Sequence, residues 1–134
     1  MPHNLKTGQI GEDVACEYIK NKGYKIIERN HRQKWGELDI VATAPNKTLV
    51  FVEVKTLTNP SFAGLKPEDN LTSSKLEKLK RTAELYANNN AAMVKDKKGW
   101  QIDLIAILMP IDVNTDLPLK ELASYCRINH YENI

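Results

Sequence analysis

The 134-residue chain is poor in cysteine, with only Cys16 and Cys126, and it contains no long hydrophobic run. The two cysteines lie far apart and outside any Cys-x-x-Cys pair, so a zinc site or a disulfide scaffold is not expected. The three histidines show no spacing typical of metal ligands. No apolar stretch approaches the roughly 18 residues of a membrane span, and the N-terminus lacks the apolar core of a signal peptide. We therefore expect a cytoplasmic protein that is not embedded in a membrane.

Net charge is also small, but the basic residues are unevenly distributed. The formal charge is +2, and the composition of 42% hydrophobic and 27% charged residues is typical of a soluble globular protein. The length suits one domain, residues 1–134, with a single core. Basic residues concentrate in 20–34 and in 75–81. Such clusters can bind phosphate backbones, although a solvated face is the commoner interpretation of each cluster taken alone.

Hydrophobic periodicity predicts an α/β fold. Helices are expected over 8–22 and 73–88, the second with a capping-box pattern at Ser74 and Glu77. Strands are expected over 24–28, 37–42, 48–56 and 100–108, with a turn over 44–47 and a loop over 59–71. In the tail, 119–126 could form a short helix and 127–131 a strand. Helices ahead of and between the strands indicate a single mixed β-sheet flanked by helices.

Charged side chains interrupt two of these apolar strands. Glu53 and Lys55 share one face of the third strand, because successive side chains of a strand point to opposite faces. If the second and third strands form a hairpin about Asn46, Asp39 lies directly opposite Glu53. The register therefore predicts that two carboxylates and a lysine meet at one place.

Two neighbouring carboxylates repel each other, and burial raises the cost. A divalent cation removes both penalties, and carboxylate oxygens suit Mg²⁺ or Mn²⁺. Such an ion can activate water and polarise a phosphodiester, and Lys55 could orient the water or stabilise charge on the phosphate. The alternative is a surface Glu–Lys pair without a ligand, which is the commoner meaning of an isolated Glu-x-Lys in a strand.

The order Asp, hairpin, Glu-x-Lys resembles the signature of the PD-(D/E)xK nuclease superfamily. More closely, the chain is similar to the bacterial YraN-like family of small proteins. The matching stretches are Gly11-Glu12 with Ala15 and Tyr18, then GYKIIERNHR (23–32), GELDIVA (36–42), LVFVEVKT (49–56), Ser61-Phe62, Lys75, IDLIAI (102–107) and the closing INHYENI (128–134). Together they extend over essentially the whole chain.

This resemblance implies a restriction-endonuclease-like core, like that of Holliday junction resolvases, and a metal-dependent endonuclease acting on DNA, including branched or damaged structures. It adds Glu12 to Asp39 and Glu53 as a metal ligand, and a helix start also favours its charge. It assigns phosphate contacts to Arg29, Arg32 and Lys75, with a structural role equally open for the arginines. Further matches are Glu37, as an outer ligand or an ion pair, and Asp103, as a structural carboxylate. A homodimer is compatible with the resemblance, because related resolvases cut two strands symmetrically.

Two departures from the family pattern favour a different interpretation. Relatives commonly have arginine where this chain has Leu57, and often where it has Gln101. Both changes remove a positive charge near the expected site. A non-catalytic nucleic-acid-binding or adaptor module on a degenerate nuclease scaffold is therefore the alternative to an enzyme. A purely protein-binding domain is a third.

Overall fold

The computed structural model describes residues 3–58, 71–95 and 97–134, which form helices and strands in the order of an α/β protein. The helices are α1 (His3–Asn21), α2 (Ser73–Asn89) and α3 (Leu119–Ser124), with a short 3₁₀ helix η2 (Ala91–Met93). The strands are β1 (Lys25–Gln33), β2 (Gly36–Thr43), β3 (Leu49–Thr58), β4 (Trp100–Met109) and β5 (Arg127–Tyr131). They form one five-stranded sheet in the order β1-β2-β3-β4-β5. The predicted fold class, a single mixed sheet flanked by helices, is confirmed.

The strand directions follow from the lengths of the connections. Short turns join β1 to β2 and β2 to β3, and both pairs are antiparallel. The β2–β3 turn lies where the sequence predicted it, with the Lys47 N–H donating to the Ala44 carbonyl oxygen at 2.8 Å. Strands β3 and β4 are parallel, which requires a long crossover, and this connection contains α2. Strand β5 then pairs antiparallel with β4 at the edge of the sheet.

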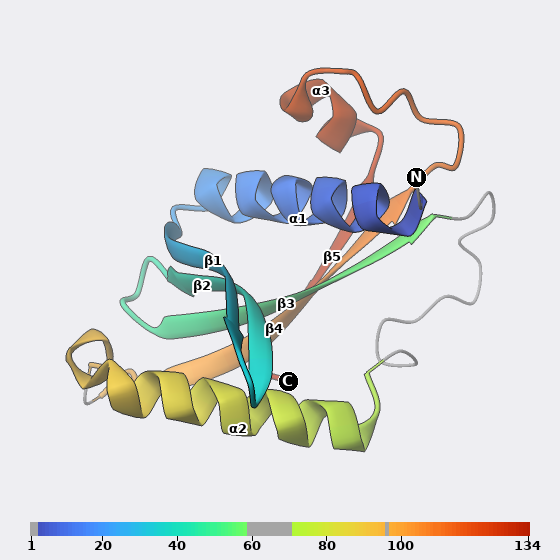
Figure 1. Cartoon of the computed structure of the whole chain (residues 1–134). Coiled ribbons are helices and arrows are strands. Elements are labelled where there is room, and N and C mark those ends of the chain that lie inside the picture. The colour runs from blue at the N-terminus through green and yellow to red at the C-terminus, as the bar shows by residue number, and fades with distance from the viewer. Residues whose placement is uncertain (1–2, 59–70, 96) are drawn as a thin grey trace.

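The two long helices cover opposite faces of the sheet (Figure 1). Alternation along β3 sends Val50 and Val52 towards α1, and Phe51 towards α2. The core under α1 includes Val14, Ala15, Ile19, Ile40 and Ile105. The core under α2 includes Leu38, Val41, Leu79, Ala83 and Tyr86. Helix α3 lies on the outer side of α1 in Figure 1 and adds side chains to the first core. Glu53 and Lys55 follow this core segment of β3 and are half-buried.

Three predicted boundaries are wrong, each where the local pattern is polar. Helix α1 begins at His3 rather than at residue 8, because its first turns show no apolar periodicity. Strand β1 runs to Gln33 rather than ending at residue 28, because an edge strand is paired on one side only and tolerates polar residues. The α2 N-cap is Thr72, whose Oγ1 accepts the Lys75 N–H at 3.3 Å, rather than Ser74.

Two further sequence expectations concern a loop and the membrane. The loop expected over 59–71 lies, except for residue 71, outside the described residues. Within the described ranges, no helix combines the length and apolar composition that a membrane span needs.

Candidate metal site

The β2–β3 hairpin has the register that the sequence predicted. The paired residues are Ile40 with Val52, Val41 with Phe51, Ala42 with Val50 and Thr43 with Leu49. Regular pairing ends at Ile40 and Val52, so the predicted pair of Asp39 with Glu53 lies one position beyond the ladder. The Asp39 side chain there takes over the role of a backbone acceptor. Its Oδ2 accepts the N–H of Val54 at 2.9 Å. The Asp39 carboxylate is therefore attached to β3 at the point where the two strands separate.

The Asp39 and Glu53 side chains lie close enough to interact. The pKa of Glu53 is raised from 4.5 to about 8. Burial of Glu53 is the main cause, followed by the charge and hydrogen bond of Asp39 and the charge of Glu37, whereas Lys55 opposes the rise. Two adjacent, partly buried carboxylates cannot both ionise at low cost, so this pair retains a proton at neutral pH.

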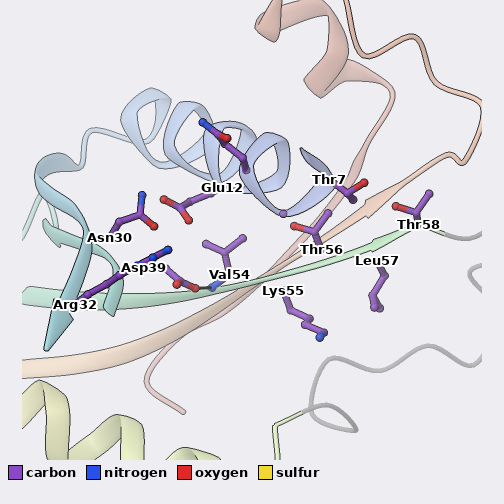
Figure 2. A pocket seen from close by; sticks show the side chains of 12 residues that line it. Thr7, Glu12, Asn30, Arg32, Asp39, Val54, Lys55, Thr56, Leu57 and Thr58 are labelled. Carbon is purple, nitrogen blue, oxygen red and sulfur yellow. Dashed lines mark hydrogen bonds between the residues drawn. The ribbon is translucent and has the colours of Figure 1, made fainter. Parts of the chain in front are cut away.

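Glu12 approaches the same place from the middle of α1, not from a helix start as the sequence suggested, because α1 already begins at His3. The helix lies very close to β3 at Gly11, where an added Cβ would collide with Thr56 Oγ1. Figure 2 shows the Glu12 and Asp39 side chains pointing into one space between α1 and β3. Burial raises the pKa of Glu12, the charge of Asp39 adds to the rise, and Arg29 opposes it. The charge of Asp39 thus reaches Glu12.

The three predicted ligands are nevertheless not fully brought together. Glu12 Oε1 accepts hydrogen bonds from Arg29 Nε and Nη2 at 3.3 and 3.2 Å, which tie it to β1. In the described part of the chain, one group of three potential metal-ligating side chains has its ligand atoms within 4.8 Å of one another. This group is Asp103, His130 and Glu132. Asp39 therefore acts on Glu53, while Glu12 is bound to Arg29.

The group around Asp103 is explained by its hydrogen bonds. Asp103 is completely buried and accepts from Gln101 Nε2 at 2.8 Å and from the Asn133 N–H at 3.0 Å. His130 Nε2 lies 2.8 Å from its other oxygen. Burial alone would raise the pKa of Asp103, but these hydrogen bonds outweigh burial and hold the pKa below its usual value. Since both carboxylate oxygens are engaged, we interpret the group as a structural network that fixes β5 and the C-terminal residues to β4.

A cavity of about 1030 Å³ opens between α1 and β3. Glu12, Asp39 and Lys55 line it, together with Arg32 and Leu57. In Figure 2, Lys55 leaves β3 on the side opposite to Val54. This is the side of Glu53, as strand alternation predicts, and the positive charge of Lys55 lowers the pKa of Glu53. The predicted cation therefore lies beside the carboxyl pair.

The three predicted phosphate contacts have different surroundings. Arg29 Nη2 lies 2.7 Å from Asp13 Oδ1 in addition to its contact with Glu12, so its charge is already compensated. Arg32 is exposed on β1 and lines the cavity beside Asp39. Lys75 is exposed in the first turn of α2 and lines a second cavity on the other face of the sheet. The structure thus places Arg32 and Lys75 at cavities, and Arg29 in salt bridges.

The second cavity, of about 330 Å³, brings additional basic residues to the site. Glu53 and Glu37 line it, with Lys34, Lys75 and Lys78. Sequence reasoning placed Lys34 and Lys78 in basic clusters but not near Glu53. The helical spacing of Lys75 and Lys78 was an available signal, because residues three apart share a helix face. Glu53 therefore lines a lysine-rich cavity beside α2, whereas Asp39 and Glu12 line the cavity under α1.

Comparisons with known proteins agree with the resemblance to the YraN-like family. The model of the uncharacterised protein family UPF0102 matches residues 11–107, a range that contains Glu12, Asp39, Glu53 and Lys55. A UPF0102 protein of Alkaliphilus oremlandii is 34% identical over 130 residues, which span 97% of each chain. UPF0102 proteins of Persephonella marina and Clostridium botulinum are each 39% identical, over 75% and 79% of this chain and 82% of each relative. The chain belongs to the protein family UPF0102.

Proposed function

We propose that this protein is a metal-dependent endonuclease that hydrolyses phosphodiester bonds in DNA. The observation that carries the proposal is the proximity of Asp39 and Glu53, with Asp39 and Lys55 lining one cavity and the charge of Asp39 acting on Glu53. Apolar residues at the two acidic positions would cost less to bury. A bound divalent cation would explain the two acidic residues, because it offsets the repulsion between their carboxylates.

The donor set suits a hard divalent ion. Asp39 and Glu53 offer carboxylate oxygens, which Mg²⁺ and Mn²⁺ prefer, and Glu12 would add a third donor if it turned away from Arg29. A bound ion of this kind supplies an activated water and polarises the phosphodiester. Glu53 would release its proton on binding, because a carboxylate ligand must be ionised.

Other residues of the chain would orient the metal ligand, the attacking water and the substrate. The Val54 N–H orients the Asp39 carboxylate, so this ligand is held in place before an ion binds. Lys55 lies beside Glu53, where it can orient the attacking water or stabilise negative charge on the phosphate. Arg32 is exposed at the wall of the same cavity and is positioned to bind a backbone phosphate.

We extend the proposal to the PD-(D/E)xK superfamily, with a restriction-endonuclease-like core. Support comes from the order of the site, in which Asp39 precedes a hairpin turn and Glu53-x-Lys55 follows on the neighbouring strand of a mixed sheet. The proposed setting is the cytoplasm, and the proposed substrates include branched or damaged DNA. A homodimer is the assembly that would cut two strands symmetrically.

Cleavage assays test the proposal. Purified protein is incubated with junction, flap and single-stranded DNA in Mg²⁺, in Mn²⁺ or in EDTA. The Glu53→Gln variant is compared with Glu84→Gln, which alters an exposed glutamate on α2. We expect metal-dependent cleavage by the wild-type and control proteins, and a loss of roughly 100-fold or more in Glu53→Gln, because metal ions contribute several kcal/mol to such reactions. Undiminished cleavage by Glu53→Gln would rule out the assignment.

A non-catalytic nucleic-acid-binding or adaptor module is the second candidate. Leu57 brings an uncharged side chain to the first cavity, and Gln101 is engaged by Asp103. Glu12 is held by Arg29 rather than by the acidic pair. Salt-dependent DNA binding with no metal-dependent cleavage would favour this candidate over the enzyme.

A further inference from the structure

The turn between β1 and β2 exposes a large aromatic side chain. Gln33 pairs with Gly36 across this hairpin, and Lys34 and Trp35 form its turn. Trp35 is 49% exposed, although an indole ring gains much from burial. The protein's other tryptophan, Trp100, is half-buried and packs against Phe51. An exposed tryptophan within a basic turn suggests a ligand with a flat apolar face and negative charge.

Helix α2 holds this turn in a fixed place. The turn reaches α2 in Figure 1, and an added Cβ at Gly36 would collide with Thr82 Oγ1. Thr82 Oγ1 donates to the Lys78 carbonyl oxygen at 2.9 Å and lies 3.5 Å from that of Trp35. The backbone that carries Trp35 is thus seated on α2 by a contact that only glycine allows.

The surroundings of the turn join it to the proposed active site. Lys34 and Gly36, the residues on either side of Trp35, line the second cavity together with Glu53. Lys75 and Lys78 line the same cavity from α2. Three lysines therefore share a cavity with Glu53, next to the turn that carries the exposed indole. Lysines attract phosphates, and an aromatic face attracts a nucleobase.

We propose that Trp35 is a stacking platform for an unpaired base and that Lys34, Lys75 and Lys78 bind phosphates of the same strand. The proposal rests on the proposed function and names its substrate class, which is nucleic acid with unpaired nucleotides. In an intact duplex, neighbouring base pairs cover the faces of each base. An unpaired base can place its face on the indole, and stacking of this kind tolerates any sequence.

Binding measurements without metal test this proposal separately from cleavage. Dissociation constants are measured by fluorescence anisotropy in EDTA, for a labelled oligothymidylate and for a blunt duplex of equal length. The variants are Trp35→Leu, Trp35→Phe and the control Tyr125→Leu, which removes an aromatic residue that is 56% exposed beside α3. Because Trp35 is exposed, the variants should fold, and circular dichroism verifies this.

Trp35→Leu should weaken single-strand binding roughly 5- to 150-fold, the range that stacking of one base on an aromatic side chain gives. Trp35→Phe should retain most of the affinity, and Tyr125→Leu and duplex binding should not change. Oligothymidylate should quench tryptophan emission in the wild type but not in Trp35→Phe, which retains only Trp100.

Two results would overturn the proposal in distinguishable ways. If Trp35→Leu binds single strands as well as the wild type and cleavage still depends on Glu53, the stacking role alone is refuted. The exposed Trp35 would then be assigned to contact with a protein partner. Failure of the wild type to bind either DNA at low salt would refute the stacking role together with the proposed function.

Discussion

Replacement of Glu53 by glutamine should stabilise the metal-free protein, and the gain should grow with pH. The pKa of Glu53 is raised from 4.5 to about 8, first by burial and then by Asp39. Because its pKa is raised, the folded protein binds the Glu53 proton more tightly than the unfolded chain does. The resulting stabilisation is fully present below pH 4.5 and is lost as the pH rises through about 8. Glutamine resembles the protonated acid in shape but does not titrate.

The size of the effect follows from the pKa difference. A rise from 4.5 to about 8 corresponds at most to about 4.8 kcal/mol, at about 1.36 kcal/mol per pKa unit. Glu53 keeps some solvent contact and lies close to other charged side chains, and both facts reduce the effect. We therefore expect the unfolding free energy of Glu53→Gln, relative to wild type, to increase by about 2 kcal/mol between pH 4.5 and pH 8.

Urea unfolding in EDTA across this pH range measures the difference, with Glu84→Gln as the control for loss of an exposed glutamate. Comparison with wild type cancels the titration of the other carboxyl groups, including Asp103. Added Mg²⁺ should stabilise the wild type at pH 8 more than Glu53→Gln, because the ion binds the folded acidic pair. A difference between wild type and Glu53→Gln that does not change with pH would refute the raised pKa that burial and Asp39 give to Glu53.

Two other substitutions test the packing that positions the site. Gly11→Ala should destabilise the protein by about 1–3 kcal/mol, because its Cβ would collide with Thr56 and push α1 away from β3; Gly8→Ala, with open space around it, should instead stabilise by about 0.5–1 kcal/mol. Equal urea midpoints for the two alanine variants would contradict the close approach of α1. His130→Ala should cost about 3–5 kcal/mol in urea unfolding, because it leaves the buried Asp103 carboxylate short of a partner, and a loss below about 1 kcal/mol would exclude that role.

The sequence was sufficient to predict that Asp39 lies near Glu53, because the geometry of a β-hairpin is regular. Side chains alternate along a strand, and a turn centred on Asn46 places Asp39 opposite Glu53. The observed register from Ile40 to Thr43 matches this arithmetic. The sequence could not predict that the ladder ends there and that Asp39 accepts the Val54 N–H. That contact depends on how the two strands diverge, which no local pattern encodes.

Contacts between distant elements were the least predictable. The resemblance identified Glu12 as a ligand and Arg29 as a phosphate contact, and the structure joins the two side chains. That salt bridge depends on where α1 crosses β1, which is set by packing at Gly11. Trp35 gave no signal in the sequence, because an isolated tryptophan is more often a core residue than an exposed one. Its exposure became visible only with the hairpin turn seated on α2.

A crystal structure of the protein soaked in Mn²⁺, with the ion located by anomalous scattering, tests the central claim most directly. We expect Mn²⁺ between the carboxylates of Asp39 and Glu53, with metal–oxygen distances of about 2.0–2.3 Å and Glu12 turned from Arg29 towards the ion. Asp39→Asn crystals, soaked in the same way, should lose the anomalous peak. Absence of Mn²⁺ from the acidic pair, or its appearance instead at Asp103, His130 and Glu132, would contradict the proposed metal site.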